Sequence, residues 1–136
     1  MIGSLNHVTL SVRDLDRSFA FYRDVLGLRP LARWKKGVYL LAGEETWICL
    51  ILDPRTRNDP LLEYTHVAFS VNPERFAIAV ERIRVSGASE WQQNSSEGDS
   101  LYFLDPDGHK LEVHAGDWRS RLEACRARPY EGMVFF

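Results

Sequence analysis

The side chains best placed to do chemistry in this 136-residue chain are two histidines and one glutamate. His7 and His66 each open the same pattern, His-Val-x-x-Ser-Val, whose β-branched and apolar residues indicate a strand. Glu112 lies in a third strand-like run, between Leu111 and Val113. Neutral imidazole and carboxylate are ligands for Mn, Fe, Co, Ni and Zn, and three protein ligands leave coordination positions open for a substrate. We therefore expect a catalytic divalent-metal site at His7, His66 and Glu112.

Three further side chains could ligate a metal, and each is a weaker candidate. Cys49 lies in the first-half run that corresponds to the run of Glu112, where no carboxylate is present. His109 precedes Glu112 by three positions and therefore points to the opposite face of the strand, so we expect a structural role for it. His114 shares the face of Glu112.

The composition is typical of a soluble globular protein, with 45% hydrophobic and 26% charged residues. A net charge of −2 gives no overall attraction to nucleic acid or to an anionic membrane, so we expect neither as a partner. The two cysteines are too few for a disulfide framework, and no apolar run approaches the roughly 20 residues that span a bilayer. No signal peptide is recognisable at the N-terminus. We expect one cytoplasmic domain over residues 1–136.

The two halves of the chain repeat one order of elements, in which a strand and a helix precede three strands. In the first half, about 1–55, we predict strands at 5–12, 28–33, 37–42 and 46–52. The helix between the first two strands begins after Asp14, a good capping residue, and ends at Gly27. Its predicted apolar stripe consists of Leu15, Phe19, Tyr22 and Leu26.

The second half, about 62–115, has the same layout. Its strands are predicted at 64–71, 88–91, 100–104 and 109–114. Asn72 and Pro73 begin its helix, which ends at Gly87. The tetrapeptide Asp-Pro-Asp-Gly at 105–108 is a strong turn signal between the last two strands. A helix at about 117–126 and a tail complete the chain.

A βαβββ module leaves one face of its sheet uncovered and cannot complete a core alone. We therefore predict an α+β fold in which the two modules form a partly closed mixed-sheet barrel. Successive side chains of a strand point to opposite faces. His7, Thr9 and Ser11 thus share one face of the first strand. We expect this polar face to line a cavity, while the apolar face packs under the helix.

The stretch 94–100, Asn-Ser-Ser-Glu-Gly-Asp-Ser, is the second unusual feature of the chain. Its carbonyl, hydroxyl and carboxylate oxygens lie close together, as the ligands of a hard monovalent or divalent cation do. A solvated loop of the same composition is the alternative. Strand alternation also places four aromatic residues toward the cavity: Tyr39, Trp47, Tyr64 and Tyr102. Their role there is either packing or substrate binding.

Together these residues resemble the fosfomycin-resistance glutathione transferases (FosA type) of the vicinal-oxygen-chelate superfamily. The similarity covers nearly the whole chain, from Leu5-Asn-His-Val-Thr-Leu10 to Pro129-Tyr-Glu-Gly-Met133. Its more specific motifs are Tyr64-Thr-His66, the loop 94–100, the segment 102–109 and Arg119-Ser-Arg121. The oxygen-rich loop is the most characteristic of them, whereas the turn with its histidine is shared across much of the superfamily.

The resemblance implies the vicinal-oxygen-chelate fold and a homodimer whose active sites form between the subunits. It also implies Mn²⁺ and K⁺ as bound ions, fosfomycin as substrate and glutathione as co-substrate. His7, His66 and Glu112 match the Mn²⁺ ligands of the family. The loop around K⁺ is matched by Asn94, Ser96, Glu97, Gly98 and Ser100.

Other positions match residues that surround the substrates in the family. Thr9 matches a hydroxyl near the epoxide oxygen, and Tyr39 matches a residue near the thiol. The phosphonate contacts are matched by Ser96, Tyr102 and Arg121. Further positions that line the family's cavity hold Trp47, Cys49 and Tyr64.

The implied reaction is nucleophilic opening of the fosfomycin epoxide by the glutathione thiolate, which confers antibiotic resistance. The metal would act as a Lewis acid, and no residue of the chain would be needed as a covalent nucleophile. Three other functions stay open. They are an epoxide hydrolase with Glu44 or Glu45 as general base, an Fe(II) ring-cleaving dioxygenase with the same ligands, and a non-catalytic antibiotic-binding protein.

One position departs from the family pattern. Where the family loop begins Trp-Lys-Gln-Asn, this chain has Trp91-Gln-Gln-Asn94, so Gln92 replaces a phosphonate-contacting lysine. A charged hydrogen bond contributes about 1.5–3 kcal/mol, against about 0.5–1.5 kcal/mol for a neutral one. We predict that Gln92 weakens fosfomycin binding and that Gln92→Lys raises kcat/KM in steady-state assays. Equal or lower efficiency of the lysine variant would contradict this explanation.

Overall fold

The computed structural model describes residues 1–136, which form two modules and a C-terminal helix. The first module contains β1 (His7–Val12), α1 (Leu15–Ala20), the π-helical turn η1 (Phe21–Val25), β2 (Arg29–Trp34), β3 (Gly37–Ala42) and β4 (Thr46–Leu52). The second contains β5 (Val67–Ser70), the 3₁₀ turn η2 (Pro73–Arg75), α2 (Phe76–Val85), β6 (Glu90–Gln92), β7 (Asp99–Leu104) and β8 (Lys110–Ala115). Helix α3 (Trp118–Ala127) follows. None of these helices combines the length and the apolar character needed to cross a membrane.

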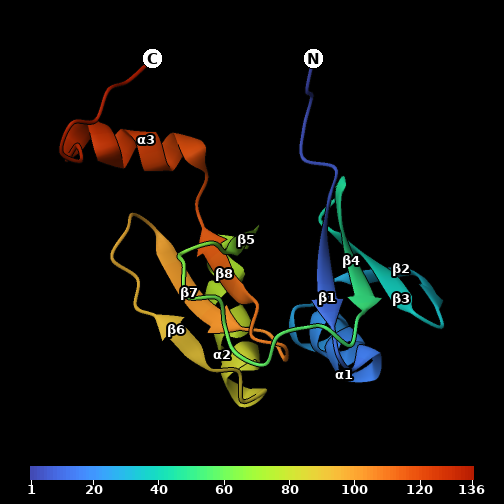
Figure 1. Cartoon of the computed structure of the whole chain (residues 1–136). Coiled ribbons are helices and arrows are strands. Elements are labelled where there is room, and N and C mark those ends of the chain that lie inside the picture. The colour runs from blue at the N-terminus through green and yellow to red at the C-terminus, as the bar shows by residue number, and fades with distance from the viewer.

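Each module folds into its own four-stranded mixed sheet. The strand orders are β1-β4-β3-β2 and β5-β8-β7-β6, and in each sheet the first pair is parallel. The predicted duplication and the α+β class are therefore confirmed. Figure 1 shows the sheets side by side as separate units, with α3 extending from the second. They do not close into one barrel within a single chain, because β1 and β5 are both edge strands.

The first helix departs from its predicted form in its second half. Asp14 caps it as expected, since its carboxylate accepts a hydrogen bond from the Arg17 N–H at 3.0 Å. Beyond α1 the chain adopts the π turn, in which the Leu26 N–H donates to the Phe21 carbonyl at 3.1 Å. The wider turn buries the adjacent Phe21 and Tyr22, at 8% and 0% exposure. A pattern with 3.6 residues per turn does not foresee this arrangement.

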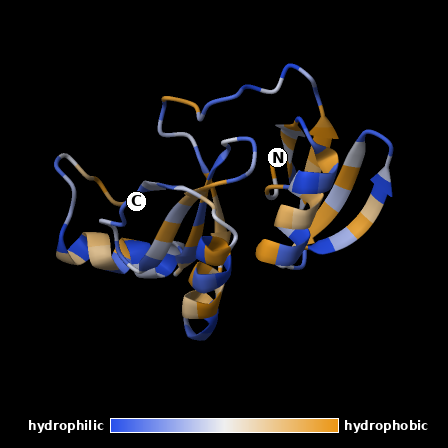
Figure 2. Cartoon of the chain, turned by 90° about the horizontal axis from the view of Figure 1, so that it is seen from below, coloured by the Kyte–Doolittle hydropathy of each residue, from blue (hydrophilic) through white to orange (hydrophobic).

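The predicted alternation along β1 is confirmed. Leu10 and Val12 belong to a buried core cluster that draws on both modules. His7 and Thr9 are exposed on the opposite face of the strand. Figure 2 shows hydrophobic and hydrophilic residues alternating along the strands. The part of this polar face around His7 and Thr9 is therefore open to solvent within one chain.

The turn between β7 and β8 attaches the second module to the first through buried polar groups. The carboxylate of Asp107, whose side chain is fully buried, accepts hydrogen bonds from the Arg13 N–H at 3.1 Å and the Ser18 hydroxyl at 3.0 Å. The Asp105 carboxylate accepts one from the Tyr22 hydroxyl at 2.7 Å. Burial raises the pKa of Asp105 above its ordinary value of 3.8. The hydrogen bond from Tyr22 acts in the opposite direction.

His109 completes this contact and has the structural role expected for it. Its Nε2 donates to the Ser11 carbonyl of β1 at 2.7 Å, since a carbonyl oxygen can only accept. Its Nδ1 then accepts a hydrogen bond from the Arg57 guanidinium at 3.0 Å. The turn is thus bonded to β1, to α1 and to the segment that joins the modules.

Removing one of these buried hydrogen bonds should destabilise the protein. We expect Tyr22→Phe to lower the free energy of unfolding by about 1.5–3 kcal/mol, because the buried Asp105 carboxyl loses a donor that water cannot replace. The matched control is Tyr64→Phe, which loses a hydrogen bond at an exposed side chain. The control should stay within about 0.5 kcal/mol of the parent chain. Urea unfolding at one fixed protein concentration measures both, and equal effects would contradict the prediction.

Candidate metal and substrate site

The second module brings two of the expected metal ligands together. Glu112 lies in β8, is 5% exposed, and pairs across the parallel register with Ala68 of β5. His66 precedes Ala68 by two residues and therefore points to the same face. The His66 Nε2 and the Glu112 Oε2 are 3.0 Å apart.

The donor set of this pair suits a divalent metal ion. The His66 Nδ1 lies 2.9 Å from the Tyr64 carbonyl oxygen, which can only accept, so Nδ1 carries a proton. The unprotonated Nε2 of His66 and a carboxylate oxygen of Glu112 then point toward the same position. A cation at that position can accept a lone pair from each of them. A hydrogen bond from the remote imidazole nitrogen is also the usual way in which histidine ligands are oriented. The chemistry of the pair therefore fits part of a coordination shell for Mn²⁺, Fe²⁺ or Zn²⁺, and its role as a metal site stays a prediction.

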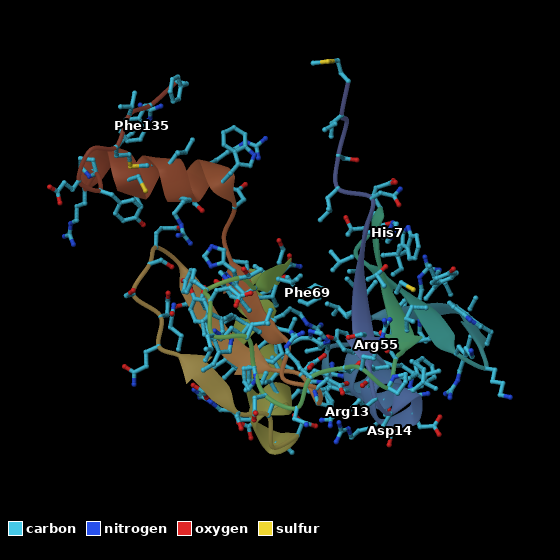
Figure 3. All side chains as sticks on the ribbon, in the orientation of Figure 1. His7, Arg13, Asp14, Arg55, Phe69 and Phe135 are labelled. Atoms are coloured by element: carbon cyan, nitrogen blue, oxygen red, sulfur yellow. The ribbon has the colours of Figure 1, made fainter.

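His7 lies elsewhere in the single chain. Its ring stacks on Trp47 with 4.1 Å between centroids, and its Nδ1 is 2.6 Å from the Asn6 Oδ1. Figure 3 shows His7 on the first sheet, away from the sheet that carries Phe69 of β5. No group of three histidine, cysteine, aspartate or glutamate side chains in the chain could hold a metal ion. One chain therefore assembles two of the three expected ligands, and the role of His7 stays a prediction.

The first sheet gathers the remaining expected residues of the first module beside His7. The strand register places Thr9, Cys49 and Tyr39 side by side on β1, β4 and β3. The rings of Tyr39 and Trp47 are 4.8 Å apart. We call this group the first half-site, formed by His7, Thr9, Tyr39, Trp47 and Cys49.

Trp34 belongs to the same face, although the motifs of the sequence do not single it out. Its ring centroid is 4.7 Å from that of Tyr39. It lies across its β3 partner Gly37, where an added Cβ would come within 2.3 Å of the indole. An aromatic residue and a glycine that flank a short turn are the signal that could have indicated this packing.

Cys49 contributes a neutral thiol to the first half-site. It is 6% exposed, and burial raises the pKa of the Cys49 thiol above its ordinary value of 9.0, against the opposing effect of a hydrogen bond with Thr9. A protonated thiol is a poor nucleophile and a poor metal ligand. Cys49 is also part of no metal-binding cluster. The weaker alternative of a cysteine ligand therefore gains no support.

Aromatic rings surround His66 in the second module. The ring centroids of Tyr64, Trp91 and Tyr102 lie 5.0, 5.5 and 5.9 Å from that of the imidazole. Trp91 is held by a hydrogen bond from its Nε1 to the Leu111 carbonyl at 3.1 Å. Tyr102 is 4% exposed, and burial raises the pKa of Tyr102 above its ordinary value of 10.0. Its hydroxyl therefore remains protonated and able to donate.

The oxygen-rich loop 94–100 curls around the side chain of Asn94. The Asn94 Nδ2 donates to the Gly98 carbonyl at 2.7 Å, and its Oδ1 accepts from the Ser96 N–H and hydroxyl, both at 3.0 Å. Gly98 has a φ of 76°, and an added Cβ would lie 2.9 Å from the Ala115 carbonyl oxygen. The loop is therefore an internally hydrogen-bonded turn that leaves Asn94, Ser95, Gly98 and Asp99 exposed, and its binding of K⁺ stays a prediction.

Two side chains connect this loop to its surroundings, and Gln92 lies at its near end. The Arg121 guanidinium of α3 donates to the Glu97 carboxylate at 3.3 Å, and the Ser100 hydroxyl donates to the Glu112 Oε1 at 2.6 Å. Gln92 donates from its Nε2 to the Tyr64 hydroxyl at 3.0 Å. We call the whole group the second half-site: Tyr64, His66, Gln92, Asn94, Ser96, Glu97, Gly98, Ser100, Tyr102, Glu112 and Arg121.

The two half-sites are not bonded to each other within the chain. Each hydrogen bond and ion pair of His7, His66 and Glu112 stays within its own module. A cavity of about 530 Å³ is lined by Thr9 and Ser11 of β1 and by His66 and His109 of the second module. The predicted site residues therefore fall into two groups, one in each module. Two of the three expected metal ligands lie in the second half-site, and the third lies in the first.

Comparison with known proteins places this architecture in a family. Residues 4–113 match the Glyoxalase/Bleomycin resistance protein/Dioxygenase superfamily. The chain is 50% identical over 137 residues to glutathione transferase FosA of Serratia marcescens, with 99% of this chain and 96% of that protein covered. Metallothiol transferase FosB of Shouchella clausii is 38% identical over 127 residues, which cover 90% of this chain and 86% of FosB.

A solved structure agrees with these relatives. It is a crystal structure of a mutant of the fosfomycin resistance protein FosX from Listeria monocytogenes, complexed with Mn(II) and 1S,2S-dihydroxypropylphosphonic acid. It superposes with a TM-score of 0.75 and 29% sequence identity, over 90% of this chain and 99% of that one. Identity at half of all aligned positions, over nearly the full length and on the same duplicated fold, leaves one assignment. The chain belongs to the Glyoxalase/Bleomycin resistance protein/Dioxygenase superfamily, among its FosA-type fosfomycin-resistance glutathione transferases.

Proposed function

We propose that this chain is a metal-dependent enzyme that adds glutathione to the epoxide of fosfomycin and so confers resistance to the antibiotic. The observation that carries the proposal is the His66–Glu112 pair, whose facing donor atoms are 3.0 Å apart on an aromatic-lined sheet face. The 50% identity to a glutathione transferase FosA supports the choice of thiol, and the Mn(II) bound to FosX supports the choice of metal. We assign Mn²⁺ to the triad and K⁺ to the loop 94–100.

The working unit is then a homodimer that shares two active sites. Each chain carries both half-sites, but on different sheets. Two copies related by a two-fold axis can place the first half-site of one chain against the second half-site of the other, and this happens twice in the pair. His7 of the partner subunit then completes the shell of His66 and Glu112. The exposure of His7 and Thr9 on an uncovered sheet face supports this pairing.

The residues of the second half-site hold the antibiotic. When bound, Mn²⁺ supplies Lewis acidity toward the epoxide oxygen. Arg121, Ser96 and Tyr102 bind the phosphonate oxygens and hold the epoxide carbon in line for attack. Thr9, from the first half-site, donates a hydrogen bond to the oxygen that gains negative charge as the ring opens.

The first half-site receives glutathione. Tyr39 pairs in register with Cys49, which in turn pairs with Thr9. The Tyr39 hydroxyl hydrogen-bonds the glutathione sulfur and so favours the reactive thiolate. In the proposed dimer, Trp47 of one chain and Tyr64 of the other would flank the shared site and shield the epoxide from water. Cys49 stays protonated and takes no part as a nucleophile.

Hydration of the epoxide is the nearest alternative, because the FosX structure contains a dihydroxypropylphosphonic acid. In this chain the candidate bases Glu44 and Glu45 are exposed on the turn between β3 and β4. A general base must come within hydrogen-bond reach of the water that it activates, and neither carboxylate belongs to the two half-sites. Thiol addition is therefore the favoured reaction.

Product analysis tests the proposed reaction. The protein with Mn²⁺, K⁺, fosfomycin and glutathione should form a glutathione adduct, followed by mass spectrometry and phosphorus NMR, and chelation of the metal should abolish it. Glu112→Ala should lose turnover about 100-fold or more and keep most of its fosfomycin binding, since it removes a metal ligand rather than the phosphonate contacts. A diol formed without consumption of glutathione would replace this proposal by a hydrolase. Unchanged resistance with the alanine variant would indicate a non-catalytic binder.

Mixing two inactive variants tests whether the sites are shared. His7→Ala and Glu112→Ala each damage both sites of a homodimer, so each should be inactive alone. Random mixing yields dimers with one intact site, and about a quarter of the parent activity is expected from the two-fold symmetry. The control mixes His66→Ala with Glu112→Ala, which lie in the same half-site and should restore nothing. Recovery in the control, or none in the test, would contradict the shared site.

A further inference from the structure

The imidazole of His114 lies behind Glu112, at the end of a short hydrogen-bonded chain. His114 and Ser100 are direct partners in the antiparallel register of β7 and β8. The His114 Nδ1 is 2.7 Å from the Ser100 hydroxyl oxygen, which is itself 2.6 Å from the Glu112 Oε1. The His114 side chain is 14% exposed. Nothing in the proposed reaction uses this imidazole.

The number of protons on these groups determines which of them donates each hydrogen bond. A carboxylate that serves as a metal ligand can only accept hydrogen bonds, so the single proton of the Ser100 hydroxyl is donated to Glu112. The contact of Ser100 with His114 must then be made by a proton on the His114 Nδ1. His114 therefore donates to Ser100, and Ser100 donates to Glu112. The second lone pair of the Ser100 oxygen stays available to a cation in the loop 94–100.

Two glycines make a slot for the imidazole. A Cβ added at Gly98 would lie 2.9 Å from the His114 Cε1, and one added at Gly116 would lie 2.6 Å from the His114 Nε2. Any larger residue at either position would push the ring out of place. The His114 Nε2 is 4.0 Å from the Glu97 carboxylate, too far for a hydrogen bond, so the Nδ1 contact is the one that orients the ring.

We propose that His114 is a positioning residue of the metal site, which holds the Glu112 carboxylate through Ser100. The inference rests on the proposed function, since it takes Glu112 as a metal ligand. The hydrogen bond from Ser100 occupies the Oε1 of Glu112 and leaves the Oε2 facing His66. A carboxylate held at one oxygen presents the other in a single orientation, so less freedom is lost when the metal binds. Because Ser100 also belongs to the loop 94–100, His114 connects the two cation sites.

The affinity for Mn²⁺ alone, measured by isothermal titration calorimetry without substrate, tests this role. In His114→Asn the amide nitrogen can take the place of Nδ1, whereas in His114→Gln it takes the place of Nε2. His114→Asn should keep the Mn²⁺ dissociation constant within about threefold of the parent value, and His114→Gln and His114→Ala should raise it about 10–100-fold. Circular dichroism and thermal unfolding of the metal-free proteins confirm that each variant is folded.

The outcomes separate this inference from the proposed function. If the parent protein binds no Mn²⁺, both fall. If it binds Mn²⁺ and His114→Gln and His114→Ala bind it equally well, only the positioning role falls. Equal losses in His114→Asn and His114→Gln would indicate packing alone and would also overturn it. Ser100→Ala combined with His114→Ala should lose no more affinity than Ser100→Ala by itself, and additive losses would show that His114 does not act through Ser100.

Discussion

The docking of the turn 105–109 on the first module is the interaction on which the rest of the structure depends. Its buried carboxylates accept hydrogen bonds from a backbone N–H, a serine and a tyrosine of the first module, and its histidine bonds to β1. A buried carboxylate that lost these donors would be left with a less well compensated charge, which costs more than the loss of a neutral contact. Strand β8 begins directly after the turn, so this docking also sets where Glu112 stands relative to the first sheet.

That constraint supports the proposal that two chains share each active site. With the modules attached through this turn, the sheets stay separate and β1 and β5 both remain edge strands. The first half-site is left on an open face, and its histidine lies on a different sheet from the pair at His66 and Glu112. Each module has a polar face, and no hydrogen bond of His7, His66 or Glu112 joins the two half-sites within one chain, although Thr9 and His66 line one cavity. In the proposed symmetric dimer, each half-site would face the other half-site of the partner chain.

The second half-site shows how a buried acid is prepared for a ligand. Glu112 has one oxygen bonded to Ser100 and the other opposite an imidazole, inside a ring of aromatic side chains. Three residues beside the two half-sites owe the packing and hydrogen-bonding roles described above to the structure: Trp34, Trp91 and His114. Trp34 and His114 lie against glycines that are close in space, and Trp91 bonds to a carbonyl on another strand. Such relations depend on strand pairing, which the order of residues does not state.

The sequence by itself determined the elements, their repetition, the turn at 105–108 and the face on which each expected ligand lies. These features are local, because the period of a strand or helix and the preferences of turn residues act over a few neighbours. Only the tertiary structure decided which ligands meet. The parallel register of β5 and β8 joined His66 to Glu112, while His7 stayed with Trp47 on the other sheet. Periodicity reports the direction of a side chain relative to its own strand, and it carries no information about the strand, or the chain, that comes to lie opposite.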